Sequence, residues 1–130
     1  MSFYTGYTKY MSEDTPQSCV FCEIVKGESF AEIVFESEDF IVIPNKYPKA
    51  PVHLLVVDKK HNKKQDTISG KYSANSYWDK LFDTIYGAIL KFGLDKTGYK
   101  LVNNGAGYNH FEHEHFHILG GSSTEPGGQT

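Results

Sequence analysis

The clearest periodic pattern in the chain is a set of large apolar side chains that recur at spacings of three and four residues. These are Trp78, Leu81, Phe82, Ile85, Ile89 and Phe92. Such spacing puts one apolar stripe along one side of an α-helix. Ser73, Asn75 and Ser76 are candidate N-caps, and Gly93 is the expected stop. We therefore expect one long helix whose stripe packs against the core.

Shorter apolar runs predict strands on both sides of this helix. We expect strands at Ile33–Glu36 and Phe40–Ile43, which form a hairpin, and further strands at Val52–Val57, Tyr99–Val102 and Glu112–Gly121. The proline-containing residues 44–51 cannot join a sheet ladder and form a loop. Cys19–Lys26 is expected to be a short helix that Gly27 ends. The segment Lys59–Ser73 is polar, and we expect it to be a connection outside the sheet that includes a flexible loop.

The order short helix, hairpin, strand, long helix and two strands predicts an α+β fold, with a mostly antiparallel sheet covered by a helix on one side. The length of 130 residues is that of a single domain. Residues 1–17 lack a sustained period and are expected to form a flexible N-terminal arm. Residues 18–121 then form the folded domain, and residues 122–130 a flexible C-terminal tail.

Composition narrows the range of partners and compartments. The chain has 13 basic and 16 acidic residues, a net charge of -3, which argues against a nucleic acid polymer as the main partner. No apolar run approaches the ~18 residues of a membrane span, and the N-terminus does not resemble a signal peptide. We expect a cytoplasmic protein, with the nucleus as the alternative. In that setting Cys19 and Cys22 indicate a metal or redox pair rather than a disulfide.

Candidate chemistry is concentrated in a row of histidines. His113, His115 and His117 alternate along the chain, so on a strand their side chains share one face. One interpretation is that the row has no function and is a solvated strand face or an incidental metal-binding patch. The other is that it is a functional phosphate or metal site built on imidazoles. Glu114 is polar where the opposite face of a central strand should be buried, so it requires a partner or an exposed edge. His53 lies in an apolar strand, where it is either a satisfied core residue or a neighbour of the histidine row.

Two sequence blocks resemble a known family. The motif His113-x-His115-x-His117-Ile-Leu is similar to the histidine-triad signature of the HIT superfamily. Pro48-x-x-Pro51-x-His53-Leu-Leu-Val-Val-x-x-x-His61 resembles the block that precedes this signature in the family, at the usual distance upstream. Together with the Cys-x-Phe-Cys start, the resemblance covers about Ser18 to Gly121 and implies a HIT-like fold.

The branch within the superfamily stays open. The short C-terminus with Leu119-Gly120-Gly121 resembles the Hint branch, whereas residues 44–48 are similar to the nucleotide phosphorylase and hexose-1-phosphate nucleotidylyltransferase branches. The resembling branches associate in pairs or larger sets, and an apolar helix and a sheet edge need cover, so we expect a homodimer.

The resemblance implies a nucleotide hydrolase or nucleotidyl transferase. Family members cleave the α-phosphorus of a nucleotide conjugate, such as a phosphoramidate or dinucleoside polyphosphate, through a nucleotidyl-histidine intermediate. The matching nucleophile is His115, and His117 would hydrogen-bond the non-bridging oxygens. His53 would support the row, and His113 completes the catalytic set. The alternative is a nucleotide-binding or scaffold protein with little activity, and a metal-buffering protein is a third hypothesis.

Residues at the family's nucleotide-binding positions include, besides His115 and His117, Val20, Phe21, Ile43, Asn45, Asn103, Gly107, Asn109 and His110. The first three would line the pocket for a purine base. Asn45 stands where relatives carry a ribose-binding acid, and Asn103 would lie near the leaving group. Asn109 and His110 replace the usual Gln-Ser pair. Backbone N–H groups from Gly107 to His110 would share the developing charge.

The resemblance also implies a structural zinc site. Cys19, Cys22, His61 and His113 have the composition of a closed tetrahedral site, and zinc-bearing relatives use ligands at the matching positions. His110 is a substitute ligand. Alternatively, both cysteines are small buried hydrophobes. A zinc ion with four protein ligands would be structural rather than hydrolytic.

Overall fold

The computed structural model describes residues 19–125, and the predicted N-terminal arm and the last five residues of the predicted tail lie outside them. Within this range, five antiparallel strands form one sheet in the order β1-β2-β3-β5-β4. The strands are β1 Phe35–Glu36, β2 Phe40–Pro44, β3 Val52–Asp58, β4 Tyr99–Val102 and β5 His115–Gly120. The helices are α1 Val20–Lys26, α2 Lys64–Ile68, α3 Tyr77–Lys91, α4 Leu94–Thr97 and the 3-10 turn η1 Ala106–Tyr108. The predicted α+β class with an antiparallel sheet is confirmed.

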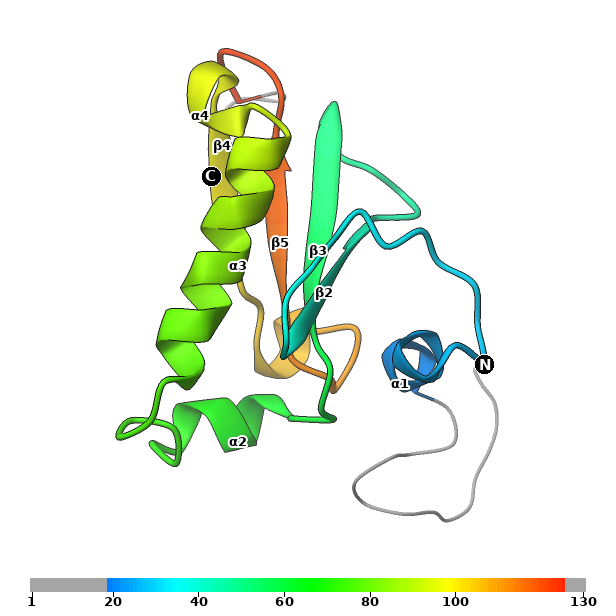
Figure 1. Cartoon of the computed structure of the whole chain (residues 1–130), viewed down its shortest axis with the longest axis vertical. Helices are drawn as coiled ribbons and strands as arrows, with labels where there is room; N and C mark the ends of the chain where they lie inside the picture. Colours follow the sequence, from blue (N-terminus) through cyan, green and yellow to red (C-terminus); the bar gives the residue numbers. More distant parts are fainter. Residues whose placement is uncertain (1–18, 126–130) are drawn as a thin grey trace.

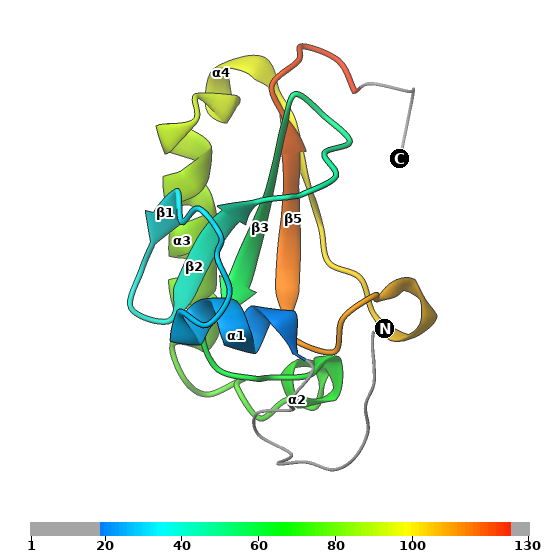
Figure 2. The ribbon, with the colours of Figure 1, turned by 90° about the vertical axis from the view of Figure 1, so that its right-hand side faces the viewer.

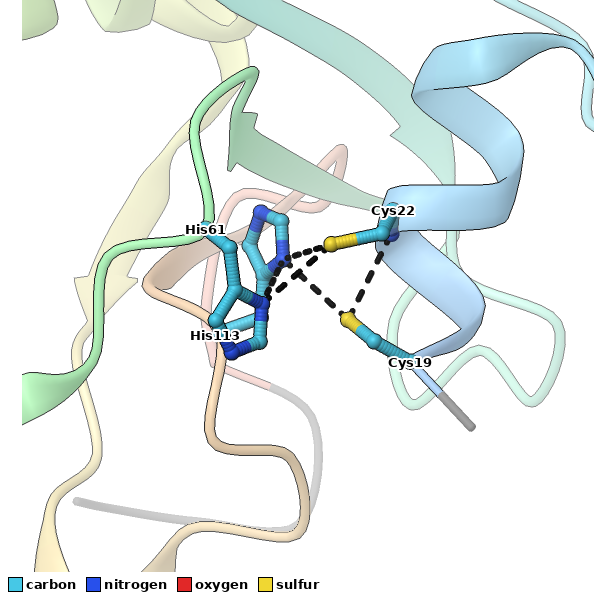
Figure 3. A group of neighbouring side chains, drawn as sticks. All are labelled: Cys19, Cys22, His61 and His113. Carbon is cyan, nitrogen blue, oxygen red and sulfur yellow. Dashed lines mark hydrogen bonds between the residues drawn. The ribbon is translucent and has the colours of Figure 1, made fainter. Parts of the chain in front are cut away.

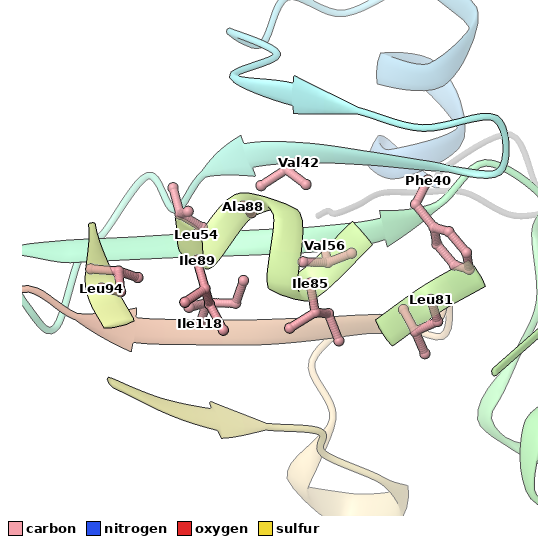
Figure 4. Close-up of a cluster of buried hydrophobic side chains, with 10 residues drawn as sticks. All are labelled: Phe40, Val42, Leu54, Val56, Leu81, Ile85, Ala88, Ile89, Leu94 and Ile118. Carbon is pink, nitrogen blue, oxygen red and sulfur yellow. The ribbon is translucent and has the colours of Figure 1, made fainter. Parts of the chain in front are cut away.

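Helices α3 and α1 lie on opposite faces of the sheet (Figures 1 and 2). The predicted apolar stripe of α3 forms the main core with alternate residues of β2, β3 and β5 (Figure 4). This cluster consists of Phe40, Val42, Leu54, Val56, Leu81, Ile85, Ala88, Ile89, Leu94 and Ile118. A smaller cluster under α1 consists of Phe21, Ile41, Ile43, Leu55 and Val57. Because both faces of β3 are covered, its sequence is an almost continuous apolar run.

The helix ends agree with the sequence signals to within about one residue. Ser76 is the N-cap of α3, and Gly93 adopts the left-handed conformation, with φ 67°, directly after the last turn. Gly27 ends α1 in the same way, with φ 79°. Cys19 is the N-cap of α1 rather than its first residue, and its Sγ accepts a hydrogen bond from the backbone of Cys22.

Two features differ from the sequence-based expectation. The histidine strand begins at His115 and not at Glu112, because its neighbour β3 ends at Asp58 and offers no further ladder. Beyond that point the N–H of Glu114 bonds to the carbonyl of Asn62 in the following loop. His113 is therefore outside the strand. Helices α2 and α4 were not predicted, because four or five residues are too few to show helical periodicity.

The segment Ser122–Glu125 follows β5 and folds back beside β4. The Ser122 hydroxyl donates to the carbonyl of Thr124, and the Lys100 ammonium pairs with the carboxylate of Glu125. In residues 19–125 no helix has the length and apolar character that a bilayer span requires.

We predict that Ile85→Ala lowers the free energy of unfolding by about 2–5 kcal/mol, because Ile85 is fully buried at the centre of the main core. Leu90→Ala, on the same helix but 65% exposed, is the matched control and should change it by less than about 0.5 kcal/mol. Urea unfolding of both variants measures the difference. Equal losses of unfolding free energy would show that burial of the apolar stripe of α3 does not stabilise the core.

Candidate active site and metal site

Three imidazoles lie side by side on the face of the sheet that carries α1. His115 and His117 are alternate residues of β5, paired with Val57 and Leu55 of β3. Their ring centroids are 5.3 Å apart. His53 of β3 joins the row, with its Nε2 2.9 Å from Nδ1 of His117. The pairing of two neighbouring strands therefore brings together three of the residues that the sequence singled out.

The tautomer of His115 follows from its hydrogen bond. Its Nδ1 lies 2.8 Å from the backbone carbonyl oxygen of His113, which can only accept, so Nδ1 carries the proton. The lone pair is then on Nε2. Burial lowers the pKa of His115 below its usual value, so the ring is neutral at pH 7. A neutral imidazole with a free Nε2 lone pair is a competent nucleophile.

A chain of hydrogen bonds fixes the other two rings. The backbone N–H of Lys49 donates to Nδ1 of His53 at 3.0 Å, so the proton of His53 is on Nε2. This Nε2 donates to Nδ1 of His117, which leaves an N–H on Nε2 of His117. Burial lowers the pKa of His53, and burial lowers the pKa of His117 to about 4. His117 is therefore a neutral hydrogen-bond donor beside the neutral ring of His115.

Apolar side chains border this row on the α1 side. The ring of Phe21 lies 5.1 Å from that of His115, and Ile43 belongs to the same buried cluster. Val20 packs partly against it. Phe111, which the sequence analysis did not single out, lies 5.1 Å from Phe21 and is 46% exposed. It lies in the loop before β5, where no strand alternation fixes its direction, so the sequence held no signal that would place it beside Phe21.

The polar residues predicted to bind the nucleotide lie at different depths. Asn45 places its Nδ2 3.2 Å from Nε2 of His53, and its Oδ1 accepts from the backbone of Tyr47. Asn109 has a buried Oδ1 without a hydrogen-bond partner among the described residues. Gly107 lies in η1, with open space where a Cβ would project. His110 is exposed.

Asn103 does not point freely into the site. Its Nδ2 donates to Oε1 of Glu114 at 2.9 Å and to the backbone carbonyl of His115 at 2.9 Å. Glu114 is buried and forms an ion pair with Lys64 of α2 at 2.8 Å. The sequence required a partner for Glu114, and the structure supplies one.

The second cluster lies at the start of α1. Ligand atoms of Cys19, Cys22, His61 and His113 all lie within 4.8 Å of one another (Figure 3). Sγ of Cys19 is 3.3 Å from Nδ1 of His113, Sγ of Cys22 is 3.2 Å from Nδ1 of His61, and the two Nδ1 atoms are 3.2 Å apart. Zinc bonds of ~2.1 Å to nitrogen and ~2.3 Å to sulfur give ligand-to-ligand edges of roughly 3.3–3.8 Å in a tetrahedron. The four residues fit a zinc ion.

The protonation of this cluster also suits a cation. Nε2 of His113 is 2.6 Å from the carbonyl oxygen of Asp58, so it carries the proton and Nδ1 presents its lone pair to the cysteines. The hydrogen bond with Cys22 lowers the pKa of the Cys19 thiol against the effect of burial, and contacts with His113 and His61 lower it further. A thiolate at Cys19 and the Nδ1 lone pair of His113, which face each other, can both bind a metal.

Comparison with known proteins agrees with this geometry. Residues 18–130 match the family model described as "Scavenger mRNA decapping enzyme C-term binding". A protein of Chlamydia muridarum named as an uncharacterized HIT-like protein is 42% identical over 105 residues, which cover 78% of this chain and 80% of the relative. This chain belongs to the HIT superfamily. Its sequence resemblance to that family is thereby confirmed.

Solved HIT structures have the same fold. A histidine triad protein from Clostridium difficile superposes with a TM-score of 0.74 at 30% identity, over 87% of this chain and 97% of that one. A HIT family hydrolase from Legionella pneumophila gives a TM-score of 0.73 at 32% identity, over 85% of this chain and all of its own (100%). The adenosine 5'-monophosphoramidase HINT3 of Danio rerio is 42% identical over a shorter stretch of 52 residues, 39% of this chain and 32% of the relative.

We predict that part of the pH dependence of stability comes from His117. Folding lowers the pKa of His117 from 6.5 to about 4. Between these two pH values the unfolded ring is mostly protonated, whereas the folded ring is mostly neutral. The stabilising contribution is complete above about pH 6.5 and is lost as the pH falls toward about 4. Urea unfolding of the wild type and His117→Asn across this range should show a shallower loss in the variant. Parallel curves, or an NMR titration of His117 near its ordinary pKa, would contradict this.

Proposed function

We propose that the protein is a nucleotide hydrolase or nucleotidyl transferase that acts at the α-phosphorus of a purine nucleotide conjugate through a nucleotidyl intermediate on His115. The observation that carries this proposal is the pair of nitrogens at the substrate side of β5. Nε2 of His115 has a free lone pair, and Nε2 of His117 has a free N–H. A nucleophile beside a hydrogen-bond donor is the arrangement that in-line attack on a phosphate requires.

In the first step, Nε2 of His115 forms a bond to the α-phosphorus as the bond to the leaving group breaks. The imidazole becomes cationic, and its Nδ1–H remains hydrogen-bonded to the carbonyl of His113. His117 donates its Nε2–H to a non-bridging oxygen. A nucleoside polyphosphate departs as an anion, whereas an amine departs with a proton taken from solvent. Water or phosphate then forms a bond to the phosphorus as the phosphorus–nitrogen bond breaks. The bonding pair returns to Nε2 of His115, and an attacking water gives its proton to solvent.

The nucleotide would lie along the α1 side of the row. In this proposal the base packs among Val20, Phe21 and Ile43, with Phe111 at the open edge. The ribose lies near Asn45, and the backbone N–H groups from Gly107 to His110 contact the phosphate. The activity in the name of the Danio rerio relative, adenosine 5'-monophosphoramidase, supports a purine nucleotide phosphoramidate as one substrate.

A nucleotide-binding or scaffold protein is the second candidate, and Asn45 is the observation that favours it. The Oδ1 of Asn45 is already engaged by the backbone N–H of Tyr47, and its Nδ2 lies against His53. No carboxylate stands at the position where relatives hold the ribose. Turnover under single-turnover conditions separates the two candidates.

We predict unequal effects for substitutions in the histidine triad. His115→Asn removes the attacking atom and should lower turnover by several orders of magnitude, as for other catalytic nucleophiles, while nucleotide affinity is largely kept. His117→Asn loses one phosphate hydrogen bond and should cost roughly a hundredfold. His113→Asn should act mainly on stability.

Single-turnover rates and nucleotide affinities of these three variants test the ranking. Labelling of His115 by a nucleotide phosphoramidate provides a direct readout of the intermediate. A His115 variant with near-native turnover, or one whose affinity falls as much as its rate, would make the row a binding or metal site and refute the enzymatic proposal.

We further propose that Cys19, Cys22, His61 and His113 bind one structural zinc ion. The ion would join α1 to the loop that precedes β5. It would also hold His113 so that the carbonyl of His113 faces Nδ1 of His115. We predict that Cys22→Ser loses stoichiometric zinc and lowers the thermal unfolding temperature, because binding at a structural site contributes folding free energy.

Elemental analysis and thermal unfolding with and without a chelator measure this effect. The wild type should be destabilised by the chelator, and Cys22→Ser should not respond further. Protein purified without chelator or added metal that contains no zinc would overturn the metal assignment without affecting the role of His115.

A further inference from the structure

Glu114 is a buried carboxylate directly before β5, next to the proposed nucleophile His115. Only 3% of its surface is exposed. Burying a carboxylate is costly unless it is paired and hydrogen-bonded. The proposed chemistry at His115 uses neither Glu114 nor its partners, so this arrangement needs its own explanation.

Three side chains from two other segments satisfy the carboxylate. Its Oε2 accepts from Nζ of Lys64 at 2.8 Å and from Oγ1 of Thr67 at 2.5 Å, both on α2. Its Oε1 accepts from Nδ2 of Asn103, in the turn after β4, at 2.9 Å. Glu114, the residue before the proposed nucleophile, is thus bonded both to α2 and to the turn after β4.

Asn103 has no N–H left for a substrate. A side-chain amide has two N–H donors, and here one is given to Glu114 and the other to the backbone carbonyl of His115. Its Oδ1 accepts from Lys64. The orientation of the amide is therefore fixed by charged groups on both sides, which makes these bonds stronger than neutral ones.

The bond from Asn103 to His115 extends the sheet past the end of its backbone ladder. The last β4–β5 pair is Val102 with His117, and no backbone pairing of β4 continues to His115. The side chain of Asn103 takes the place of the missing strand neighbour. On the other edge, the carbonyl of Glu114 accepts from the N–H of Asp58, so the chain entering the nucleophile is held from both sides.

We propose that Glu114 is a positioning residue for the nucleophile, and that it holds Asn103 as a clamp on the backbone of His115 rather than as a contact to the leaving group. This inference rests on the proposed function of His115. Lys64 keeps the buried carboxylate paired, and its alkyl chain lies under the turn, 3.4 Å from where a Cβ on Gly105 would be. The network sets where Nε2 of His115 points relative to the bound phosphate.

The test separates positioning from mere stability. Glu114→Leu alone leaves Lys64 unpaired and should destabilise the fold, whereas Glu114→Leu combined with Lys64→Met replaces the ion pair by apolar groups of similar size, which often preserves stability. We expect the double variant to unfold near the wild-type temperature but to turn over roughly ten- to a hundredfold more slowly, with little change in KM. Glu36→Leu with Lys59→Met, which removes an ion pair of 2.7 Å at the surface, is the matched control and should keep wild-type turnover.

Asn103→Ala tests the clamp against the leaving-group role. As a clamp, Asn103 acts on His115 whatever the substrate, so the fold-loss in turnover should be the same for an adenosine phosphoramidate and a diadenosine polyphosphate. A loss confined to one leaving group would overturn the proposal. A stable Glu114→Leu/Lys64→Met variant with wild-type turnover would overturn it as well.

A readout without substrate keeps this inference distinct from the enzymatic proposal. Backbone amide hydrogen exchange at residues 103–107 and 114–116 should be faster in the stable double variant than in the wild type, and unchanged in the Glu36/Lys59 control. If the wild type and His115→Asn are equally inactive, the proposed function fails while the exchange result still decides the positioning role. Unchanged hydrogen exchange in the double variant would refute the positioning role of Glu114.

Discussion

The antiparallel pairing of β3 with β5 is the constraint on which the rest of the structure depends. Its register sets Leu55 opposite His117 and Val57 opposite His115. Because side chains alternate, the same register turns Leu54, Val56 and Ile118 toward α3 and closes the main core. A slip by one residue would turn the imidazoles toward α3 and the main-core residues toward the face that carries α1. The free energy of packing therefore also enforces the geometry of the histidine row.

The end of this pairing divides the histidines between two tasks. Where β3 stops at Asp58, the chain of the histidine motif leaves the sheet, and His113 turns toward the cysteines of α1. His113 remains joined to the histidine row through its carbonyl, which fixes the proton of His115. The proposed zinc site would thus contribute to the proposed nucleophile by holding a hydrogen-bond acceptor, without contacting the substrate.

Much of this arrangement could be predicted from the sequence. The α3 stripe, the hairpin and the apolar run of β3 have periodicities long enough to identify, and the triad motif identified the row. The sequence could not show where β5 begins, because that depends on where its partner strand ends. It also could not show that Asn103 points to Glu114, since side-chain direction in a turn depends on contacts from distant α2. Helix α2 itself has one buried residue, Thr67, and so no apolar stripe to detect.

The direction of the hydrogen-bond chain through His53 and His117 explains which nitrogen of His117 carries the proton. An imidazole is neutral only if one nitrogen donates and the other accepts, so a row of neutral rings has a polarity set at one end. Here the backbone N–H of Lys49 sets it, because it can only donate to His53. His53 in turn donates to Nδ1 of His117, which leaves an N–H on Nε2 of His117 for the proposed substrate. Burial keeps every ring uncharged and so prevents a protonated histidine from reversing the order. The backbone of the proline-containing loop, distant from the triad in sequence, thereby determines which nitrogen of His117 carries the N–H that the proposed function requires.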